Sequence, residues 1–406
     1  MPWGLGAAAG EHVAALSEDW GDVLPFPGEG ATRGVFLRGQ VVELPLTPAA
    51  VGELFGLSGS AAVGAQVASN RAKVRMGNVV SLGQECRSLW DWAVSRLGRE
   101  VAETVCAPYA RARFAAEPAE LMAYTGFWLH GRGAPEGWVV SALAPSERNA
   151  RRRAAILDAG GDIVDGVTVE EIEVEDGRVT AVLTDQGREH ADRVVVDARP
   201  ADVAAWLPDE VVDPPWQHDL THLHHAHAAQ VTLPARCAVL PWALHVVDPA
   251  RPFHRLTRPG LLPGGAHLVD HVTAHLTLDP ADPLWSGSDD ALVQAVRAGL
   301  EGIATPLEGQ AIVQRFPWAV PQLDLAGHPC LKRRIEAWDR LGILAVGSRA
   351  TMRSEELALE AAFLADVEEA EPRKDRVLNQ HDGHRRLYER PVSLPRAARL
   401  RPLFSD

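Results

Sequence analysis

Runs of alternating and continuous apolar residues predict where this chain forms strands. Residues 33–46 alternate between polar and apolar types around a glycine, which predicts a hairpin. A short strand at 162–164 and a second hairpin at 167–184, with an acidic turn ending in Gly177, are expected next. The run 191–198 is almost continuously apolar, a pattern typical of a strand covered on both faces of its sheet.

Helical spacing of apolar residues predicts helices in many of the remaining segments. The predicted helices cover residues 47–57, 81–109, 118–129, 146–157, 200–208, 289–303, 331–340 and 355–369. Strand-like sequence fills much of 220–279, and a further strand is expected at 342–347. This mixture predicts the α/β class, with an α+β lobe where strands and helices are segregated.

Composition narrows the class of protein. The chain has 406 residues, of which 46% are hydrophobic and 23% charged, so it can bury more than one core. Its 54 acidic and 40 basic side chains give a net charge of −14, which disfavours a nucleic-acid partner. No apolar run approaches the ~20 residues of a membrane helix, and the first residues do not resemble a signal peptide. We therefore expect no transmembrane segment and a cytoplasmic location.

The four cysteines, Cys86, Cys106, Cys237 and Cys330, lie far apart in the sequence. None belongs to a C-x-x-C pair, so zinc knuckles and redox dithiols are disfavoured. We expect buried or chemically idle thiols.

Five segments resemble the superfamily of FAD-dependent amine oxidases, protoporphyrinogen oxidases, phytoene desaturases and UDP-galactopyranose mutases. They are Arg96-Leu97-Gly98-Arg99-Glu100 with Ala107-Pro108-Tyr109, residues 159–172, residues 191–200, Arg315-Phe316-Pro317-Trp318-Ala319-Val320-Pro321-Gln322, and residues 342–347. In that order they resemble the family's substrate-lid helix, the strand under the FAD adenine, the strand returning to the nucleotide domain, the last substrate strand and the strand leading to the flavin. The likeness spans most of the chain, although each motif is only moderately specific.

The resemblance implies an incomplete Rossmann-like FAD-type domain, a mixed β-sheet substrate domain and a helical lid. The FAD-type domain would be discontinuous. The expected boundaries are 1–46, 146–210 and 341–370 for the FAD-type domain, 47–145 for the helical lid, 211–340 for the substrate sheet and 371–406 for a basic C-terminal tail.

The domain is expected to be incomplete because the dinucleotide fingerprint is not recognisable. Family members open with a strand and a G-x-G-x-x-G loop, whose amides and helix dipole hold the pyrophosphate. Here residues 4–10 have one residue too many, and only three residues precede them. Residues 3–7 resemble better the stretch just after that first βαβ unit. The resemblance thus implies a missing unit, either because the sequence begins late or because the pyrophosphate site has been lost.

The resemblance also implies FAD as the cofactor and indicates residues that would contact it. They are Val169 on the adenine-side strand, Gly347 at the end of the last strand and Ser354 as the N-cap of the following helix. Glu355 and Glu356 place two carboxylates in that helix's first turn, where they satisfy the helix dipole and would repel a reduced flavin. The truncation and these charges both weaken the expectation of FAD binding.

A small-molecule pocket is expected around four residues of the substrate domain. Pro241 to His245, followed by a P-F-x-R element, resembles the family's substrate sheet. The pocket candidates are Trp242, His245, Arg255 and Trp318. Aromatic faces suit an apolar or planar ligand, and arginine suits a carboxylate or a phosphate. The alternative for each tryptophan is ordinary core packing.

Histidines are concentrated in the substrate domain, where ten of the 16 fall between His218 and His275. His222, His224, His267 and His271 are weak metal-ligand candidates. A metal needs three or four converging ligands, and no single helix supplies them here. We therefore expect no metal site.

These observations favour an FAD-superfamily oxidoreductase, of the amine oxidase type, that acts on an apolar or cyclic small molecule. The alternative is a flavin-free homologue that binds a ligand, forms a partner subunit or a homodimer, or uses its His-rich sheet for metal or acid–base chemistry. No catalytic residue can be singled out from the sequence.

Overall fold

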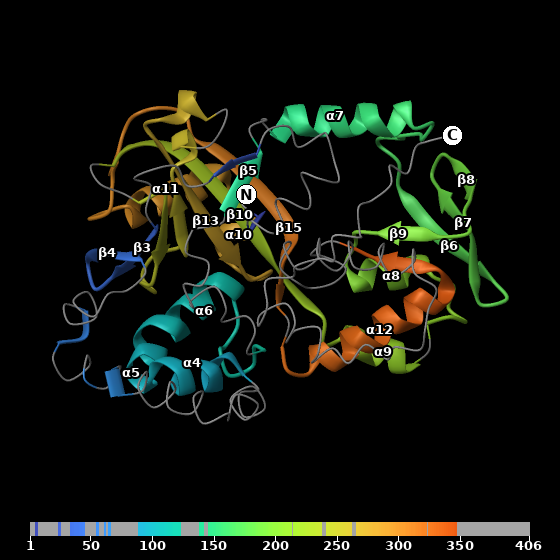
Figure 1. Ribbon diagram of the computed structural model, residues 1–406, viewed down its shortest axis with the longest axis horizontal. Helices are drawn as coiled ribbons and strands as arrows, with labels where there is room; N and C mark the ends of the chain where they lie inside the picture. Colours follow the sequence, from blue (N-terminus) through green and yellow to red (C-terminus); the bar gives the residue numbers. More distant parts are fainter. Residues whose placement is uncertain are drawn as a thin grey trace, which may run out of the picture.

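The protein is seen here in a computed structural model. It describes residues 33–44, 88–122, 145–212, 214–237, 241–261, 265–322 and 324–346, the short strands 5–6, 23–25 and 138–141, and isolated residues between 54 and 65. The described elements gather in two groups, one built on a large sheet and one on smaller sheets and helices (Figure 1). The architecture is mixed α/β, as the sequence predicts.

The large sheet occupies one half of the molecule (Figure 1). Its order is β14-β10-β13-β12-β11-β3-β4, and β15 also pairs with β10. The strands are β3 (Arg33–Leu37), β4 (Gln40–Leu44), β10 (His224–Arg236), β11 (Ala243–Val246), β12 (Arg255–Thr257), β13 (His271–Leu278), β14 (Thr305–Pro306) and β15 (Ile312–Gln322). All pairs are antiparallel except β3 with β11.

Alternation along β13 gives the large sheet two different faces. Val272, Ala274, Leu276 and Leu278 lie in one core with Leu292, Val296 and Leu300. The helix α11 (Asp289–Gly299) provides two of these last three residues, and Leu300 caps it. A short helix, α10 (Pro283–Ser286), precedes it. The intervening β13 residues Thr273, His275 and Thr277 face the other way and are nevertheless buried.

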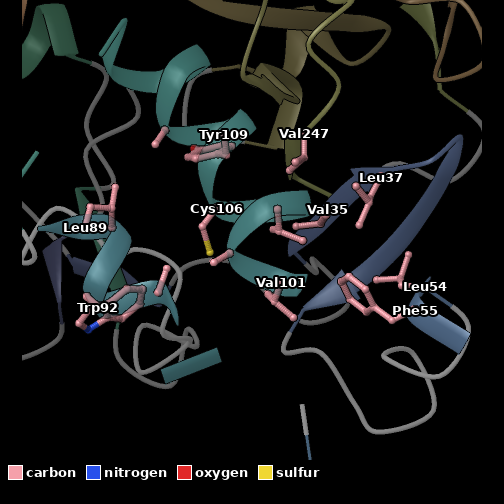
Figure 2. Packing of buried hydrophobic residues seen from close by; sticks show 14 of the residues in the cluster. Val35, Leu37, Leu54, Phe55, Leu89, Trp92, Val101, Cys106, Tyr109 and Val247 are labelled. Carbon is pink, nitrogen blue, oxygen red and sulfur yellow. The ribbon is translucent and has the colours of Figure 1, made fainter. Parts of the chain in front are cut away.

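A group of helices covers the second face. It comprises α4 (Leu89–Leu97), α5 (Arg99–Val101), a π-helical segment (Ala102–Cys106) and α6 (Ala107–Phe114). Ser88 caps α4 in a capping box with Asp91. The helices pack on the β3–β4 hairpin through a core that includes Leu37, Trp92 and Tyr109, as Figure 2 shows. These helices lie within residues 47–145, the range in which the sequence predicts a helical lid.

The second group of elements lies beyond β15 (Figure 1). It contains α7 (Pro145–Asp158), the antiparallel meander β6 (Val169–Glu175), β7 (Arg178–Thr184) and β8 (Gly187–His190), the parallel pair β9 (Val194–Val196) and β16 (Ile343–Ala345), and the helices α8 (Pro200–Trp206), α9 (Pro214–Leu220) and α12 (Gly327–Leu341). Trp216 and Trp338 are fully buried in its core, with ring centroids 6.2 Å apart.

A buried ion pair joins two helices of this group. Asp219 at the end of α9 is 1% exposed, and its Oδ2 forms an ion pair with Nε of Arg334 in α12 at 2.9 Å. Arg333 pairs with the same carboxylate. Burial by itself would raise the pKa of Asp219. The hydrogen bonds from Arg333 and the charge of Arg334 lower this pKa by more than burial raises it, so the net shift is downward. The carboxylate is therefore ionised and ties α9 to α12.

A third, small sheet contains the first described strand. β1 (Leu5–Gly6) and β2 (Val23–Pro25) both pair antiparallel with β5 (Trp138–Ser141). Leu5 and Gly6 thus lie outside the parallel pair β9–β16, beside which the first strand of a dinucleotide fold would lie.

Four sequence predictions differ from the structure. Residues 118–122 form a turn and two β-bridges, not the start of a helix, because Leu121 pairs with Asp324. Residues 162–164 form no strand. Val195 is 59% exposed, so β9 is not covered on both faces. The hairpin 33–44 joins the large sheet through β11, whereas the expected boundaries placed it in the nucleotide-type domain.

No helix in the described part of the chain combines the length and the apolar character needed to cross a bilayer.

Candidate active site

A buried polar cluster fills the space between α6 and the second face of the large sheet. Its members come from three neighbouring strands, from the residue before β12 and from the helix above them. They are Tyr109, Arg113, His245, His254, Arg255, Thr257 and His275. Tyr109 and four of these sheet residues, His245, His254, Thr257 and His275, are less than 9% exposed. Such a water-poor polar cluster is where we look for chemistry.

Strand register brings the sheet residues together. His245 of β11 is the cross-strand partner of Arg255 of β12, and Arg255 is that of His275 of β13. Directly opposed side chains on one face lie within contact distance. Two of the pocket residues expected from the sequence, His245 and Arg255, are therefore neighbours. Trp242 lies just before β11, is 7% exposed, and accepts a backbone hydrogen bond from Arg258 at its carbonyl.

Hydrogen bonds determine which nitrogen of His275 carries the proton. An Nη2 of Arg255 lies 3.3 Å from Nδ1 of His275, and Oγ1 of Thr257 lies 2.8 Å from Nε2. Because a guanidinium has only donors, Nδ1 must accept. Nε2 of the neutral ring therefore bears the hydrogen and donates it to Thr257.

A hydrogen bond between side chains joins α6 to the large sheet. The hydroxyl of Tyr109 lies 2.8 Å from Nδ1 of His245, and the two rings meet edge-on at 5.3 Å. The ring of His254 also meets that of Tyr109 edge-on, with ring centroids 6.0 Å apart. Nδ1 of His254 is buried and has no hydrogen-bond partner in the described part of the chain. A buried polar atom left in this way marks a place where a ligand can bind.

The cluster is electropositive. Burial, together with the charges of Arg113 and Arg255, lowers the pKa of His254 well below 6.5. Burial and the same two arginines also lower the pKa of His275 well below 6.5. Both rings are thus neutral at physiological pH, whereas the arginines keep their charge. The cluster can therefore attract negative charge through its arginines while these two imidazoles stay neutral.

Trp318, the fourth expected pocket residue, lies elsewhere on the sheet. It belongs to β15, and its backbone amide donates to Nδ1 of His227 at 3.0 Å. The His227 ring stacks on Trp285 at 3.9 Å, and the guanidinium of Arg199 lies 4.7 Å from the Trp318 ring. Trp318 has a φ of 54°, which is strained for an aromatic residue. This aromatic stack is separate from the cluster under α6 in the contacts that the structure describes.

The residues expected to contact FAD are only partly described. Val169 begins β6, is half-buried, and pairs with Thr184. Gly347 and Ser354 lie outside the described residues, just beyond β16. The parallel pair β9–β16 therefore leads toward the expected flavin contacts without showing them.

The described residues do not provide a cradle for a pyrophosphate. Such a cradle needs a glycine loop between a parallel strand and a helix N-terminus. The helix after β9, α8, has its N-terminus occupied by the carboxylate of its own Asp202. The strand Leu5–Gly6 lies in the antiparallel sheet.

The expected metal candidates do not converge. His222 packs its ring against His218 at 5.1 Å, and His224 and His267 are exposed. His271 is half-buried at the start of β13. Within the described ranges, no group of three or more His, Cys, Asp or Glu side chains could hold a metal ion.

A surface hollow of about 360 Å³ lies on the β6–β8 meander, away from the cluster. Its lining includes Arg188 and His190, which are exposed, and Arg188 is occupied by a bidentate pair with Glu173. Because its lining is mostly exposed and Arg188 is already paired, the hollow is not a candidate active site.

Five members of the cluster were not singled out as pocket residues from the sequence: Tyr109, Arg113, His254, Thr257 and His275. Tyr109 and Arg113 are four residues apart, so they share a face of α6. The sequence shows this spacing, but only the tertiary structure shows that this face of α6 packs over the large sheet.

The structure is similar to many solved structures of one superfamily. No protein-family model matches the sequence, and no curated protein is similar to it in sequence. A protein assigned as a protoporphyrinogen oxidase, from Exiguobacterium sp. 255-15, aligns with a TM-score of 0.66 and 17% identity, over 90% of this chain and 87% of that one.

Two further structures show the same fold. A reduced UDP-galactopyranose mutase aligns with a TM-score of 0.63 and 11% identity, over 83% of this chain and 77% of that one. Cyclohexylamine oxidase from Brevibacterium oxydans IH-35A aligns with a TM-score of 0.57 and 14% identity, over 90% and 87%. The chain has the fold of the FAD-dependent oxidoreductase superfamily, which confirms the resemblance seen in the sequence at the level of fold.

Proposed function

We propose that this protein is an oxidoreductase of the FAD-dependent superfamily that oxidises or desaturates an apolar or cyclic small molecule. The fold supports the class of reaction, although a fold alone does not determine function. The observation that carries the proposal is the buried polar cluster beneath α6. The space between a large sheet and the helices that cover it is ordinarily filled with apolar side chains, so a polar cluster there points to function.

The residues of the cluster have distinct proposed roles. Tyr109 and His245 share a hydrogen bond of 2.8 Å, so they can hold or move a proton at the wall of the site. Arg255 and His275 orient polar groups of the substrate, and α6 excludes water. FAD, when bound, supplies the hydride acceptor. Val169, Gly347 and Ser354 are the proposed contacts to it.

Spectroscopy of the purified full-length chain tests the cofactor. We expect visible flavin absorbance, either as purified or after titration with FAD. Protein that stays colourless and takes up no FAD would refute the proposal. If flavin binds, anaerobic mixing with a panel of cyclic amines should bleach its absorbance.

His245→Gln tests the site. We expect this variant to keep bound flavin and to lose most substrate-dependent bleaching, because the proton-holding pair with Tyr109 is broken. His190→Gln, at an exposed position on β8, is the matched control and should behave like the unmodified protein. Equal bleaching by both variants would exclude a role for the cluster in the reaction.

A second function is favoured by one observation. The described residues contain the parallel pair β9–β16 but no pyrophosphate cradle. A flavin-free homologue could use the same cluster to bind a ligand, as a partner subunit or a homodimer, or for acid–base chemistry. Absence of FAD uptake combined with saturable ligand binding would favour this alternative, and elemental analysis would test its metal-dependent version.

A further inference from the structure

The guanidinium of Arg113 has no acidic partner among the residues that the structure describes, whereas three other arginines that are at least partly buried have one. Arg334 pairs with Asp219, Arg251 with Asp248 and Arg315 with Asp289. The guanidinium of Arg113 makes no hydrogen bond or ion pair with any residue that the structure describes, and it lies 5.3 Å from the ring of Phe114. A sequestered cation without a counter-charge costs free energy unless a ligand supplies the charge.

The neighbours of Arg113 cannot supply that charge themselves. Its charge is felt by both His254 and His275, and Tyr109 is the neighbour that acts on Arg113 in turn. Both histidine rings are neutral at physiological pH, because their pKa values lie well below 6.5. Arg255, which also borders His254, adds a second positive charge. The described part of the cluster is therefore a buried site with positive charge and no carboxylate in contact with Arg113.

The backbone that carries Arg113 is held to the sheet. Its carbonyl accepts a hydrogen bond of 2.9 Å from the hydroxyl of Thr277 on β13. The next two carbonyls, of Phe114 and Ala115, accept from the amide of Gln322 on β15 at 2.7 and 3.1 Å. Three hydrogen bonds from two strands thus fix the end of α6. A cation on a rigid element is preorganised for binding.

We propose that this site binds its substrate through a carboxylate group that pairs with Arg113, beside His254. A planar carboxylate can take two hydrogen bonds from one guanidinium, and the unpaired Nδ1 of His254 offers a further polar contact. Tyr109 also belongs to the hydrophobic core with Val35 and Leu37 that Figure 2 shows, so apolar side chains adjoin the site. The substrate class is an apolar carboxylic acid. This inference rests on the proposed function only in placing the substrate at the same cluster.

Binding of a simple probe pair tests the proposal without requiring activity. The probes are 2-naphthoate and its neutral isostere 2-naphthamide, titrated calorimetrically into the full-length chain, with any flavin it carries. We expect 2-naphthoate to bind about tenfold or more tightly than 2-naphthamide, since charge-assisted hydrogen bonds are the stronger ones. Equal affinities would overturn the proposal.

Arg113→Met should abolish the preference for the carboxylate. Arg111→Met is the matched control, because Arg111 lies on the same helix but is exposed and pairs with Glu117. It should keep the preference. A preference that persists in Arg113→Met would overturn the proposal, as would competition by inorganic sulfate as strong as that by 2-naphthoate, which would show a general anion site.

Thermal melting separates binding from a structural role. Removing a buried cation that has no counter-charge should leave the melting temperature of Arg113→Met unchanged or higher. A lower melting temperature would show that Arg113 serves the fold. The two proposals fail separately: flavin uptake without carboxylate preference rejects only this one, and carboxylate binding without flavin rejects only the oxidoreductase.

Discussion

At the scale of single residues, the feature that most distinguishes this protein is a set of neutral histidines under a helix. His254 and His275 are 3% and 4% exposed, and burial together with neighbouring arginines keeps the pKa of each well below 6.5. They belong to the cluster that we propose as the active site. Their protonation therefore links the state of the site to the stability of the fold.

We expect stability to fall as the pH drops below about 6.5. In the unfolded chain both histidines take up protons there, whereas in the folded chain they stay neutral, so the unfolded state gains. Each contributes a slope of about 1.4 kcal/mol per pH unit within this window, and neither contributes above it. Urea unfolding at a series of pH values measures the slope.

The variant His275→Gln should reduce that slope, and His190→Gln, at an exposed position, should not. The carboxylates with lowered pKa values act at lower pH, since their ordinary values lie near 4. A stability that does not change between pH 6.5 and 5 would contradict the neutral, buried state of the two rings.

Thiol reactivity offers another test at this scale. Burial raises the pKa of Cys106 to about 12, and the side chain is 1% exposed in the core shown in Figure 2. Because the thiolate is the reactive form, Cys106 should resist alkylation in the folded protein. Mass spectrometry after iodoacetamide treatment should find the half-buried Cys237 modified first. Rapid modification of Cys106 in native buffer would show that the helical layer opens readily.

At the scale of elements, the close approach of one segment to the end of α11 explains why a glycine stands there. Gly299 ends α11 against the segment just before β12, and a Cβ added there would lie 2.7 Å from Cε1 of Phe253. Its backbone is not in the left-handed region, so packing alone requires the glycine. The ion pair of Asp219 with Arg334 likewise fixes how α9 meets α12.

Gly299→Ala should destabilise the protein by about 1 to 3 kcal/mol, the usual cost of overpacking. Helix propensity by itself would give the opposite sign, a gain of up to about 1 kcal/mol. Chemical denaturation distinguishes the two. The reverse change at a neighbouring exposed site, Ala298→Gly, reports the propensity alone. A stabilised Gly299→Ala protein would show that the helix can move away from Phe253.

Asp219→Asn should cost roughly 3 kcal/mol, because Arg334, which is 7% exposed, loses its counter-charge. The surface pair of Asp165 with Arg153 provides the control, and Asp165→Asn should cause no measurable change. Thermal and urea unfolding, followed by tryptophan fluorescence, report the loss because Trp216 and Trp338 lie in the same core. A neutral Asp219→Asn would mean that water replaces the carboxylate.

At the scale of the whole molecule, the two groups of elements are unequally built. β10 has 13 residues and pairs with strands on both sides, whereas β9 and β16 each have three residues and pair with each other. Parallel sheets are ordinarily covered on both faces, yet Val195 is 59% exposed. The proposed substrate sheet is thus complete, and the nucleotide-type part is minimal in the described residues.

Hydrogen exchange should reflect this difference. Amides of β13 should exchange near the rate of global unfolding, and those of β9 and β16 much faster, because short exposed pairs open locally. Exchange followed by mass spectrometry measures both. Addition of FAD should slow exchange in β9 and β16 if the cofactor binds there. Equal protection of the two sheets without FAD would show that the small pair is not a weak point.

The sequence by itself determined the local structure and the fold class. Its periodicities are set by contacts within a few residues, so the hairpin of β6 and β7, the helix α7 and the strand β16 could be read from it. The family motifs determined the fold, which the comparisons confirm. His245 and Arg255 were picked as pocket residues because both occur in one such motif.

Only the tertiary structure decided which residues meet. Tyr109 lies 136 positions before His245, and the hydroxyl of Thr277 reaches the carbonyl of Arg113 across 164 positions. Such pairs depend on strand register and on where α6 docks, and neither leaves a local pattern. The same long-range packing exposed Val195 and separated Trp318 from the cluster. That the guanidinium of Arg113 has no acidic partner among the described residues can be seen only from the tertiary structure, because acidic partners can come from any part of the sequence.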